Sequence, residues 1–136
     1  MRRAVSTVLP EPVSDPFTSP WWPTELISHS ADKTLEIRWD DGRADTLAAE
    51  YLRVESPSAE VQGHGPGQKM LVAGRRHVGI LKVEAVGHYA VRIVFDDLHD
   101  SGIYSWRYLR ELADEQPARW AEYLAALDAK GKRRDP

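Results

Sequence analysis

Apolar and polar residues alternate along several short stretches in the first two thirds of the chain, as in strands that bury one face. Leu35, Ile37 and Trp39 alternate with charged residues in the clearest of these stretches. An Asp-Gly pair follows at positions 41 and 42, and this dipeptide is a strong signal for a tight hairpin turn. The pattern therefore predicts a β-hairpin over residues 35–47.

A second pair of alternating stretches predicts another hairpin. The apolar positions of its two strands are Leu81, Val83 and Ala85, then Tyr89, Val91, Ile93 and Phe95. A Gly-His turn at positions 87 and 88 separates them. Because the two strands are consecutive and close, we expect them to pair antiparallel with one apolar face.

Helical spacing replaces alternation in the last third of the chain. One stripe is Trp106, Leu109 and Leu112, with Ser105 as N-cap and with Arg107, Arg110 and Glu111 interpreted as the wet face. A second helix begins near Pro117, carries the stripe Trp120, Leu124 and Leu127, and ends at Gly131 before a charged tail expected to be solvated. A short helix is predicted over 48–53. Strands first and helices last indicate an α+β fold: a small antiparallel sheet of hairpins with C-terminal helices packed on it.

Three segments follow from this pattern. Residues 1–23 contain five prolines and are predicted to form an extended Pro-rich arm, since proline removes donors and resists helix. Trp21 and Trp22 end the arm, and we expect them to pack on the domain. Residues 24–114 form the domain itself, and residues 115–136 form the C-terminal helix and its tail.

Composition limits the function classes. The chain has 136 residues, 42% of them hydrophobic, which suits one core. A net charge of −3 argues against general nucleic-acid binding. The absence of cysteine excludes disulfides and thiolate chemistry. No apolar run approaches the ~20 residues of a membrane helix, and no signal peptide is evident, so the expected location is the cytoplasm.

Residues 55–69 form a long glycine-containing loop, and a loop of this length is often functional. Its segment GHGPGQK (63–69) superficially resembles a phosphate-binding loop. However, Gln68 separates the last glycine from Lys69, and Met70 follows in place of Ser or Thr. Nucleotide binding is therefore not expected, whereas binding of some anion by backbone amides stays open.

The densest cluster of potentially reactive side chains is the DDLHD turn, with Asp96, Asp97, His99 and Asp100. Carboxylates beside an imidazole can hold a metal or share a proton. Such residues also suit a solvated turn that caps the next helix. The His-x-Asp pattern of a mononuclear iron site is absent, and no later histidine completes it.

Four pieces of the sequence resemble the gamma-butyrobetaine hydroxylase-like N-terminal domain family, which includes small stand-alone bacterial proteins of unknown function. The pieces are LEIRWDDG (35–42), LR followed by SPSAEV (52–61), VGHYAVRIVFDDLHDSGIYSW (86–106) and YLREL (108–112). In the larger members, the hydroxylase activity belongs to a separate C-terminal oxygenase domain. The resemblance therefore implies a domain without enzymatic activity of its own.

The resemblance also implies a place for a metal. In metal-binding members, three cysteines in a C-x-C-x-x-C pattern follow the LR pair, and a histidine from the D-x-H turn completes a structural zinc site. These positions are Ser56, Ser58, Val61 and His99 in this chain. A hydroxyl is a poor zinc ligand and valine is none, so we expect a degenerate site without zinc or any other cofactor. We expect His99 to tie its turn to the 56–58 loop by a hydrogen bond.

Three functions compete. The first is an accessory or protein-interaction domain, present as a monomer or weak homodimer, with an unknown protein partner. The second is a metal-binding domain using His99 with Asp97 or Asp100, and His64. Family members joined to a P-loop ATPase of the iron–sulfur carrier type would link this function to metal-cofactor assembly. The third is a small enzyme or anion-binding module at the glycine loop and the DDLHD turn. His64, Asp97, Asp100 and Trp106 are the predicted ligand or partner contacts.

Overall fold

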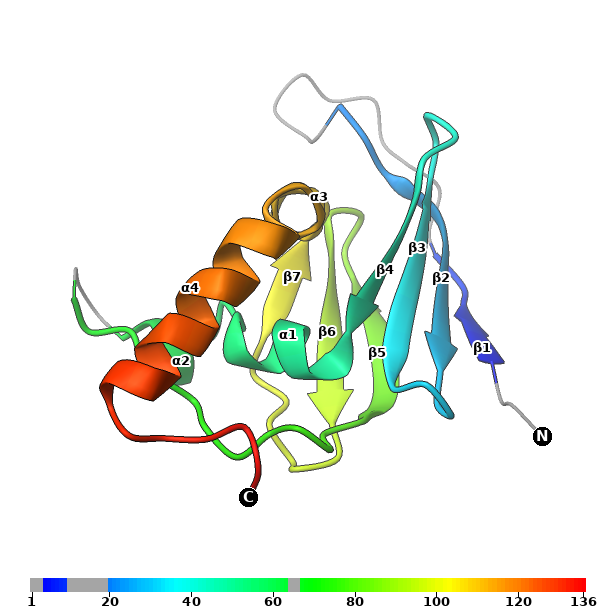
Figure 1. Cartoon of the computed structure of the whole chain (residues 1–136). Helices are drawn as coiled ribbons and strands as arrows, with labels where there is room; N and C mark the ends of the chain where they lie inside the picture. Colours follow the sequence, from blue (N-terminus) through cyan, green and yellow to red (C-terminus); the bar gives the residue numbers. More distant parts are fainter. Residues whose placement is uncertain (1–3, 10–19, 64–66) are drawn as a thin grey trace.

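The computed structural model describes residues 4–9, 20–63 and 67–136. Figure 1 shows the arrangement of the elements. In chain order they are β1 (Ala4–Thr7), β2 (Pro23–His29), β3 (Thr34–Trp39), β4 (Ala44–Ala48), α1 (Ala49–Val54), α2 (Ala59–Gln62), β5 (Ile80–Val86), β6 (Ala90–Phe95), β7 (Ile103–Ser105), α3 (Trp106–Asp114) and α4 (Gln116–Ala129). The predicted α+β class is confirmed.

The first sheet has four antiparallel strands in the order β1-β2-β3-β4. The hairpin predicted over residues 35–47 is present as β3 and β4, and Leu35 lies opposite Leu47 in its register. The turn places Gly42 at a φ of +87°, a conformation that glycine adopts without strain. The first strand, β1, lies within the segment predicted to be an extended arm, and it pairs antiparallel with β2. Residues 10–19 of that arm lie outside the described residues.

The second sheet has three antiparallel strands in the order β5-β6-β7. Val83 lies opposite Ile93, as expected for the second predicted hairpin. The prediction that Leu81 shares the buried face is wrong, because a register irregularity between Ile80 and Lys82 leaves Leu81 exposed. Ala85, near the end of β5, is exposed as well. Tyr89 is likewise exposed, because it precedes the first residue of β6.

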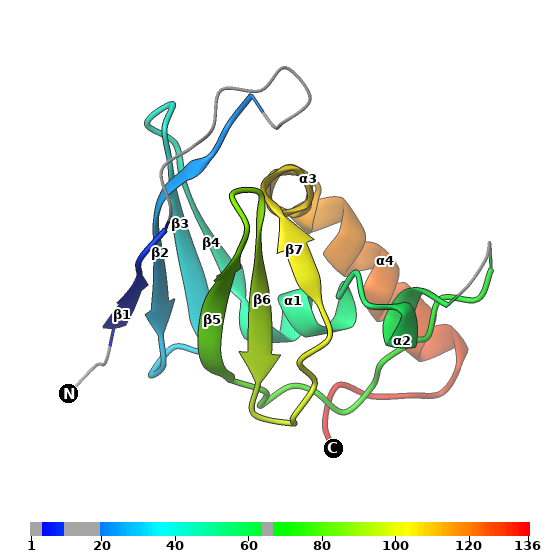
Figure 2. The same ribbon diagram turned by 180° about the vertical axis from the view of Figure 1, so that it is seen from behind.

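The helices cover one face of the second sheet (Figures 1 and 2). The predicted N-cap of α3 is present, with the Ser105 hydroxyl accepting a hydrogen bond from the Tyr108 amide at 3.0 Å. The stripe predicted on α4 is partly wrong, because Tyr123 and Leu127 are buried whereas Leu124 is exposed. The long loop predicted over 55–69 contains the short helix α2, which Ser58 caps.

The main core forms between the two sheets and the helices. Its fully buried members include Leu26, Leu35, Ile37, Leu47, Leu52, Val91, Ile93, Phe95, Tyr104, Leu109 and Leu112. Two buried tyrosines satisfy their hydroxyls on backbone carbonyls, Tyr51 on Leu112 and Tyr104 on Leu52. The core therefore contains polar atoms that fix α1 to α3 and to β7.

Arg110 was predicted to lie on the solvent-exposed face of α3, and this prediction is wrong. Its guanidinium carbon lies 4.9 Å from the Trp21 ring centroid and 5.1 Å from that of Trp39. It also donates to the Asp41 carboxylate at 2.8 Å, and the side chain is buried. Trp21 packs against the core as predicted, and so does Trp22. Arg110 therefore joins the end of the arm, the first sheet and α3.

Replacing Arg110 by alanine is expected to lower the free energy of unfolding by about 2 kcal/mol, because two cation–π contacts and buried packing are lost together. Urea unfolding followed by tryptophan fluorescence measures this change. Arg107→Ala on the same helix is the matched control, with an expected change below about 0.5 kcal/mol because Arg107 is exposed. Equal effects of the two variants would contradict the role assigned to Arg110.

The tail after α4 is exposed except at the half-buried Arg134, as expected for a solvated tail. It is nevertheless bound to the domain, because two of its carbonyls accept hydrogen bonds from the 74–76 segment. In addition, Arg134 forms an ion pair with the buried carboxylate of Glu50. The tail is therefore part of the folded domain. Among the described residues, the longest helices fall short of the length and apolarity needed to cross a bilayer.

Candidate functional site

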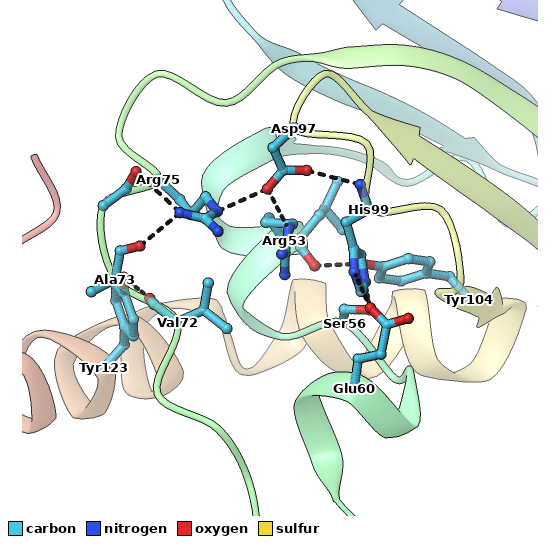
Figure 3. A network of polar contacts seen from close by, with 12 residues as sticks. Arg53, Ser56, Glu60, Val72, Ala73, Arg75, Asp97, His99, Tyr104 and Tyr123 are labelled. Atoms are coloured by element: carbon cyan, nitrogen blue, oxygen red, sulfur yellow. Dashed lines mark hydrogen bonds and ion pairs between the residues drawn. The ribbon is translucent and has the colours of Figure 1, made fainter. Parts of the chain in front are cut away.

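The structure brings Ser56 and His99 together, although 43 residues separate them. The Ser56 Oγ lies 2.9 Å from the His99 Nε2 (Figure 3). Ser56 follows the end of α1, and His99 lies in the turn between β6 and β7. Both side chains are buried. The hydrogen bond expected between the turn and the 56–58 loop is therefore present.

Asp97 holds the turn in shape. One of its carboxylate oxygens accepts from the His99 amide at 3.1 Å, and the Phe95 amide donates to the His99 carbonyl at 3.0 Å. Leu98 sits between them at a φ of +72°, which is uncommon for a residue with a side chain. The other Asp97 oxygen accepts from Arg53 and from Arg75, each at 2.8 Å. The turn is thereby fixed to α1 and to the segment around residue 75.

The second ring nitrogen of His99 contacts Glu60, whose carboxylate lies 3.2 Å from Nδ1. Glu60 stands in the first turn of α2 because its amide donates to the capping hydroxyl of Ser58. Burial lowers the pKa of His99, and the positive charge of Arg53 acts in the same direction. His99 is therefore neutral near pH 7. Because a carboxylate only accepts, the proton lies on Nδ1, and Nε2 accepts from the Ser56 hydroxyl.

The contacts Ser56–His99–Glu60 follow the order of a nucleophile, a base and an orienting carboxylate. Their surroundings argue against that chemistry. Ser56 is 0% exposed, and a Cβ built on Gly102 would lie only 2.6 Å from its Oγ, so no space is left for a substrate. The arrangement is instead a polar network, buried at Ser56 and His99 and exposed at Glu60, that joins the turn to the loop.

The residues at the four family metal positions do not fit zinc. His99 alone is a usual zinc ligand. The Ser58 hydroxyl lies 2.7 Å from that of Ser101, and Val61 is a buried apolar residue without a donor atom. Over residues 4–9, 20–63 and 67–136, no three His, Asp or Glu side chains gather as a metal-binding group.

The other residues predicted to contact a ligand or partner do not gather around His99. The Asp100 carboxylate lies 4.0 Å from Arg92 and does not join His99. Trp106 is buried, and its indole nitrogen donates to the His88 carbonyl. His64 lies outside the described residues. Of the four residues predicted as ligand or partner contacts, Asp97 is therefore the one described residue that belongs to the His99 network.

Three residues of the network were missed in the sequence: Arg53, Glu60 and Arg75. Arg53 belongs to the LR pair and Glu60 to SPSAEV, which are both motifs of the family resemblance. Their partners are 44 and 39 residues away. Lys69, at the end of the glycine loop, is bound to the buried carboxylate of Glu55 at 2.8 Å. That ion pair neutralises part of the charge that an anion would need.

The lowered pKa of His99 predicts a specific pH dependence of stability. Above about pH 6.5, His99 is neutral in both the folded and the unfolded chain. As the pH falls below that value, the unfolded chain takes up a proton that the folded chain does not. The free energy of unfolding therefore falls until the pH passes the folded-state pKa, and then levels off.

Urea unfolding between about pH 7.5 and 5 measures this dependence. His99→Gln keeps a polar side chain at the position but has no ionisable ring, so this part of the slope should vanish. Arg53, Glu60 and Asp97 stay unchanged in the comparison. An identical slope in both proteins would show that His99 does not titrate differently on unfolding.

The chain is a small α+β domain with two antiparallel sheets. The hydrogen bond between Ser56 and His99 links the loop after α1 to the turn between β6 and β7. The family model described as "Gamma-butyrobetaine hydroxylase-like, N-terminal" matches residues 26–110. The chain belongs to this family. The resemblance seen in the sequence is thereby confirmed.

Solved structures agree with this assignment. One solution NMR structure is 49% identical, with a TM-score of 0.74, and the match covers 84% of this chain and 90% of that one. A second is 44% identical, with a TM-score of 0.77 and coverages of 91% and 92%. The third is a crystal structure of a protein of unknown function from Acidithiobacillus ferrooxidans ATCC 23270, assigned to the DUF971 family. It is 38% identical, with a TM-score of 0.57 and coverages of 67% and 91%. No curated protein matches the chain.

Proposed function

We propose that the chain is an accessory protein-interaction domain that binds another protein and carries no catalytic machinery of its own. The observation that carries this proposal is the outward face of the β5–β6–β7 sheet. In Figure 2 this face is turned to the viewer, and the helices lie behind the sheet. No described helix covers it.

The register shows which side chains point outward. Val91, Ile93 and Phe95 point into the core, so the alternate positions of β6 and their partners lie on the opposite face. Val86 and Ile103 belong to that outward face, and they are 37% and 50% exposed. Two apolar side chains on one uncovered sheet face support a role in protein contact.

Charged residues accompany these apolar ones. Arg92 lies between Glu84 at 2.7 Å and Asp100 at 4.0 Å, and Lys82 lies 3.8 Å from Glu84. Non-obligate protein interfaces mix apolar and polar surface in this way. The mixture keeps the domain soluble while it is unbound, and it supports a partner that associates reversibly.

The test compares two surface changes in the full chain. Chemical cross-linking in cells, followed by mass spectrometry, identifies proteins held by the wild type, including any factor of metal-cofactor assembly. Val86→Asp with Ile103→Asp should abolish this capture. Leu124→Asp is the matched control, because Leu124 is 39% exposed on α4, and it should leave capture intact. Identical capture by all three proteins would contradict the proposed surface.

A further inference from the structure

The tail, residues 132–136, lies against the segment Gly74–Arg76 through main-chain hydrogen bonds. The Gly74 amide donates to the Arg133 carbonyl at 2.9 Å, and the Arg76 amide donates to the Arg134 carbonyl at 3.0 Å. Gly74 adopts a φ of +70°. A Cβ there would lie 3.4 Å from the Pro136 Cα, so the tail and this segment are in close contact. These bonds use backbone atoms, which any extended segment offers.

The side chain of Arg134 gives the contact specificity. Its Nε and Nη2 donate to the two carboxylate oxygens of Glu50 at 2.9 and 2.6 Å. The Glu50 side chain is only 6% exposed, and the guanidinium carbon lies 5.2 Å from the Trp120 ring centroid. A paired fork of donors and a stacked aromatic ring select arginine over lysine.

The next residue of the tail is also recognised by its charge. The Asp135 carboxylate forms an ion pair with Arg76, whose amide already binds the Arg134 carbonyl. An Arg-Asp pair therefore meets a carboxylate at its first position and a guanidinium at its second. This is a complementary pattern of charges and not only an acidic patch.

The tail fills only part of the hollow in which Arg134 lies. A pocket of about 440 Å³ remains beside it. Its lining includes Tyr51, Pro117 and Trp120 in addition to Glu50 and Arg134. A longer or bulkier segment would find apolar surface there that residues 132–136 leave open.

We propose that Glu50, Trp120 and the Gly74–Arg76 segment form a recognition site for an extended Arg-Asp segment of a partner protein, and that residues 132–136 occupy this site in cis. This site is separate from the outward face of the β5–β6–β7 sheet. A result that contradicts one of the two proposed surfaces does not contradict the other. The tail acts as a tethered competitor, since the short hydrogen-bonded connection of residues 130–132 holds it next to α4 and gives it an effective concentration in roughly the millimolar range or above. A partner segment binds when it displaces the tail.

The test uses the full chain with Arg134→Ala and Asp135→Ala, which weakens the tethered competitor. Fluorescence anisotropy measures binding of a labelled peptide with the sequence of residues 130–136, Lys-Gly-Lys-Arg-Arg-Asp-Pro. The double variant should bind the peptide about tenfold or more tightly than the wild type. A peptide with lysine in place of the arginine that corresponds to Arg134 should bind about tenfold more weakly, because the paired fork is lost.

Two further variants show whether the proposed contacts make the site. Adding Glu50→Gln to the double variant should abolish binding, and adding Arg76→Ala should weaken it. Circular dichroism confirms that each protein is folded, and Arg76→Ala retains a readout if Glu50→Gln unfolds the chain. Equal binding of the arginine and lysine peptides, or no gain in the folded double variant, would overturn the proposal. Either result would leave capture through the sheet face unaffected.

Discussion

Replacing Ser56, Ser58 and Val61 together by cysteine is expected to give a chain that binds one zinc ion tightly. The change installs the C-x-C-x-x-C pattern that the family resemblance implies for a zinc site, and thiolates are strong zinc ligands. His99 is already placed for this role, because its Nε2 faces position 56 at 2.9 Å. Its lowered pKa keeps the ring neutral near pH 7, and the contact of Nδ1 with Glu60 leaves Nε2 available to a metal. Zinc at 1,000 times its dissociation constant would stabilise the fold by about 4 kcal/mol.

Elemental analysis gives the zinc content of the triple variant, and thermal unfolding with and without EDTA gives the stabilisation. The control adds His99→Ala to the three cysteines, which removes the fourth ligand and should weaken zinc binding. The wild type should show no zinc-dependent shift in melting temperature. A folded triple variant that stays free of zinc would show that the 56–61 loop is no longer shaped for the family site.

Replacing Gly102 by alanine is expected to lower the free energy of unfolding by about 3 kcal/mol, at the upper end for overpacking. A Cβ at this position would lie 2.6 Å from the Ser56 Oγ and 3.0 Å from the Tyr104 Cε1. Neither neighbour can move easily, because Ser56 is bonded to His99 and the Tyr104 ring is fully buried. The strain therefore acts directly where the 56–58 loop contacts the turn between β6 and β7.

Urea unfolding measures this loss. Gly79→Ala is a matched control, because its Cβ would meet only the carboxylate of Asp96, which can rotate away, and its loss should be smaller. In a Ser56→Ala background the loss caused by Gly102→Ala should shrink by about 1 kcal/mol or more, since the nearest atom is gone. Additive effects of the two changes would refute the close approach.

The elements with a strong local pattern were predictable. Alternation identified β3 with β4 and β5 with β6, and helical spacing identified α3 and α4. β7 was missed because three residues are too few to show a period. β1 was missed because it lies in a segment read as a proline-rich arm. The exposure of Leu81 depends on an irregular register that the apolar pattern does not reveal.

The candidate site was predictable where the family motif carried it. The motif placed Ser56 and His99 in one site, and the structure shows their hydrogen bond. It gave no sign of Arg75, because Arg75 lies outside the family motifs and 22 positions before Asp97 in the sequence, so no local pattern links the two. Arg110 was assigned to a wet helix face for a similar reason. Its helix shows only charged positions there, whereas Trp21 and Trp39, which enclose it, come from distant parts of the chain.

The network of Ser56, His99 and Glu60 is formed entirely by side chains of this chain. A joint made of a hydroxyl, an imidazole and a carboxylate forms when folding brings the three side chains together. The same joint contains no thiolate, so peroxide has no sulfur to oxidise at this position. Oxidants of thiols therefore leave the contact between the turn and the 56–58 loop unchanged.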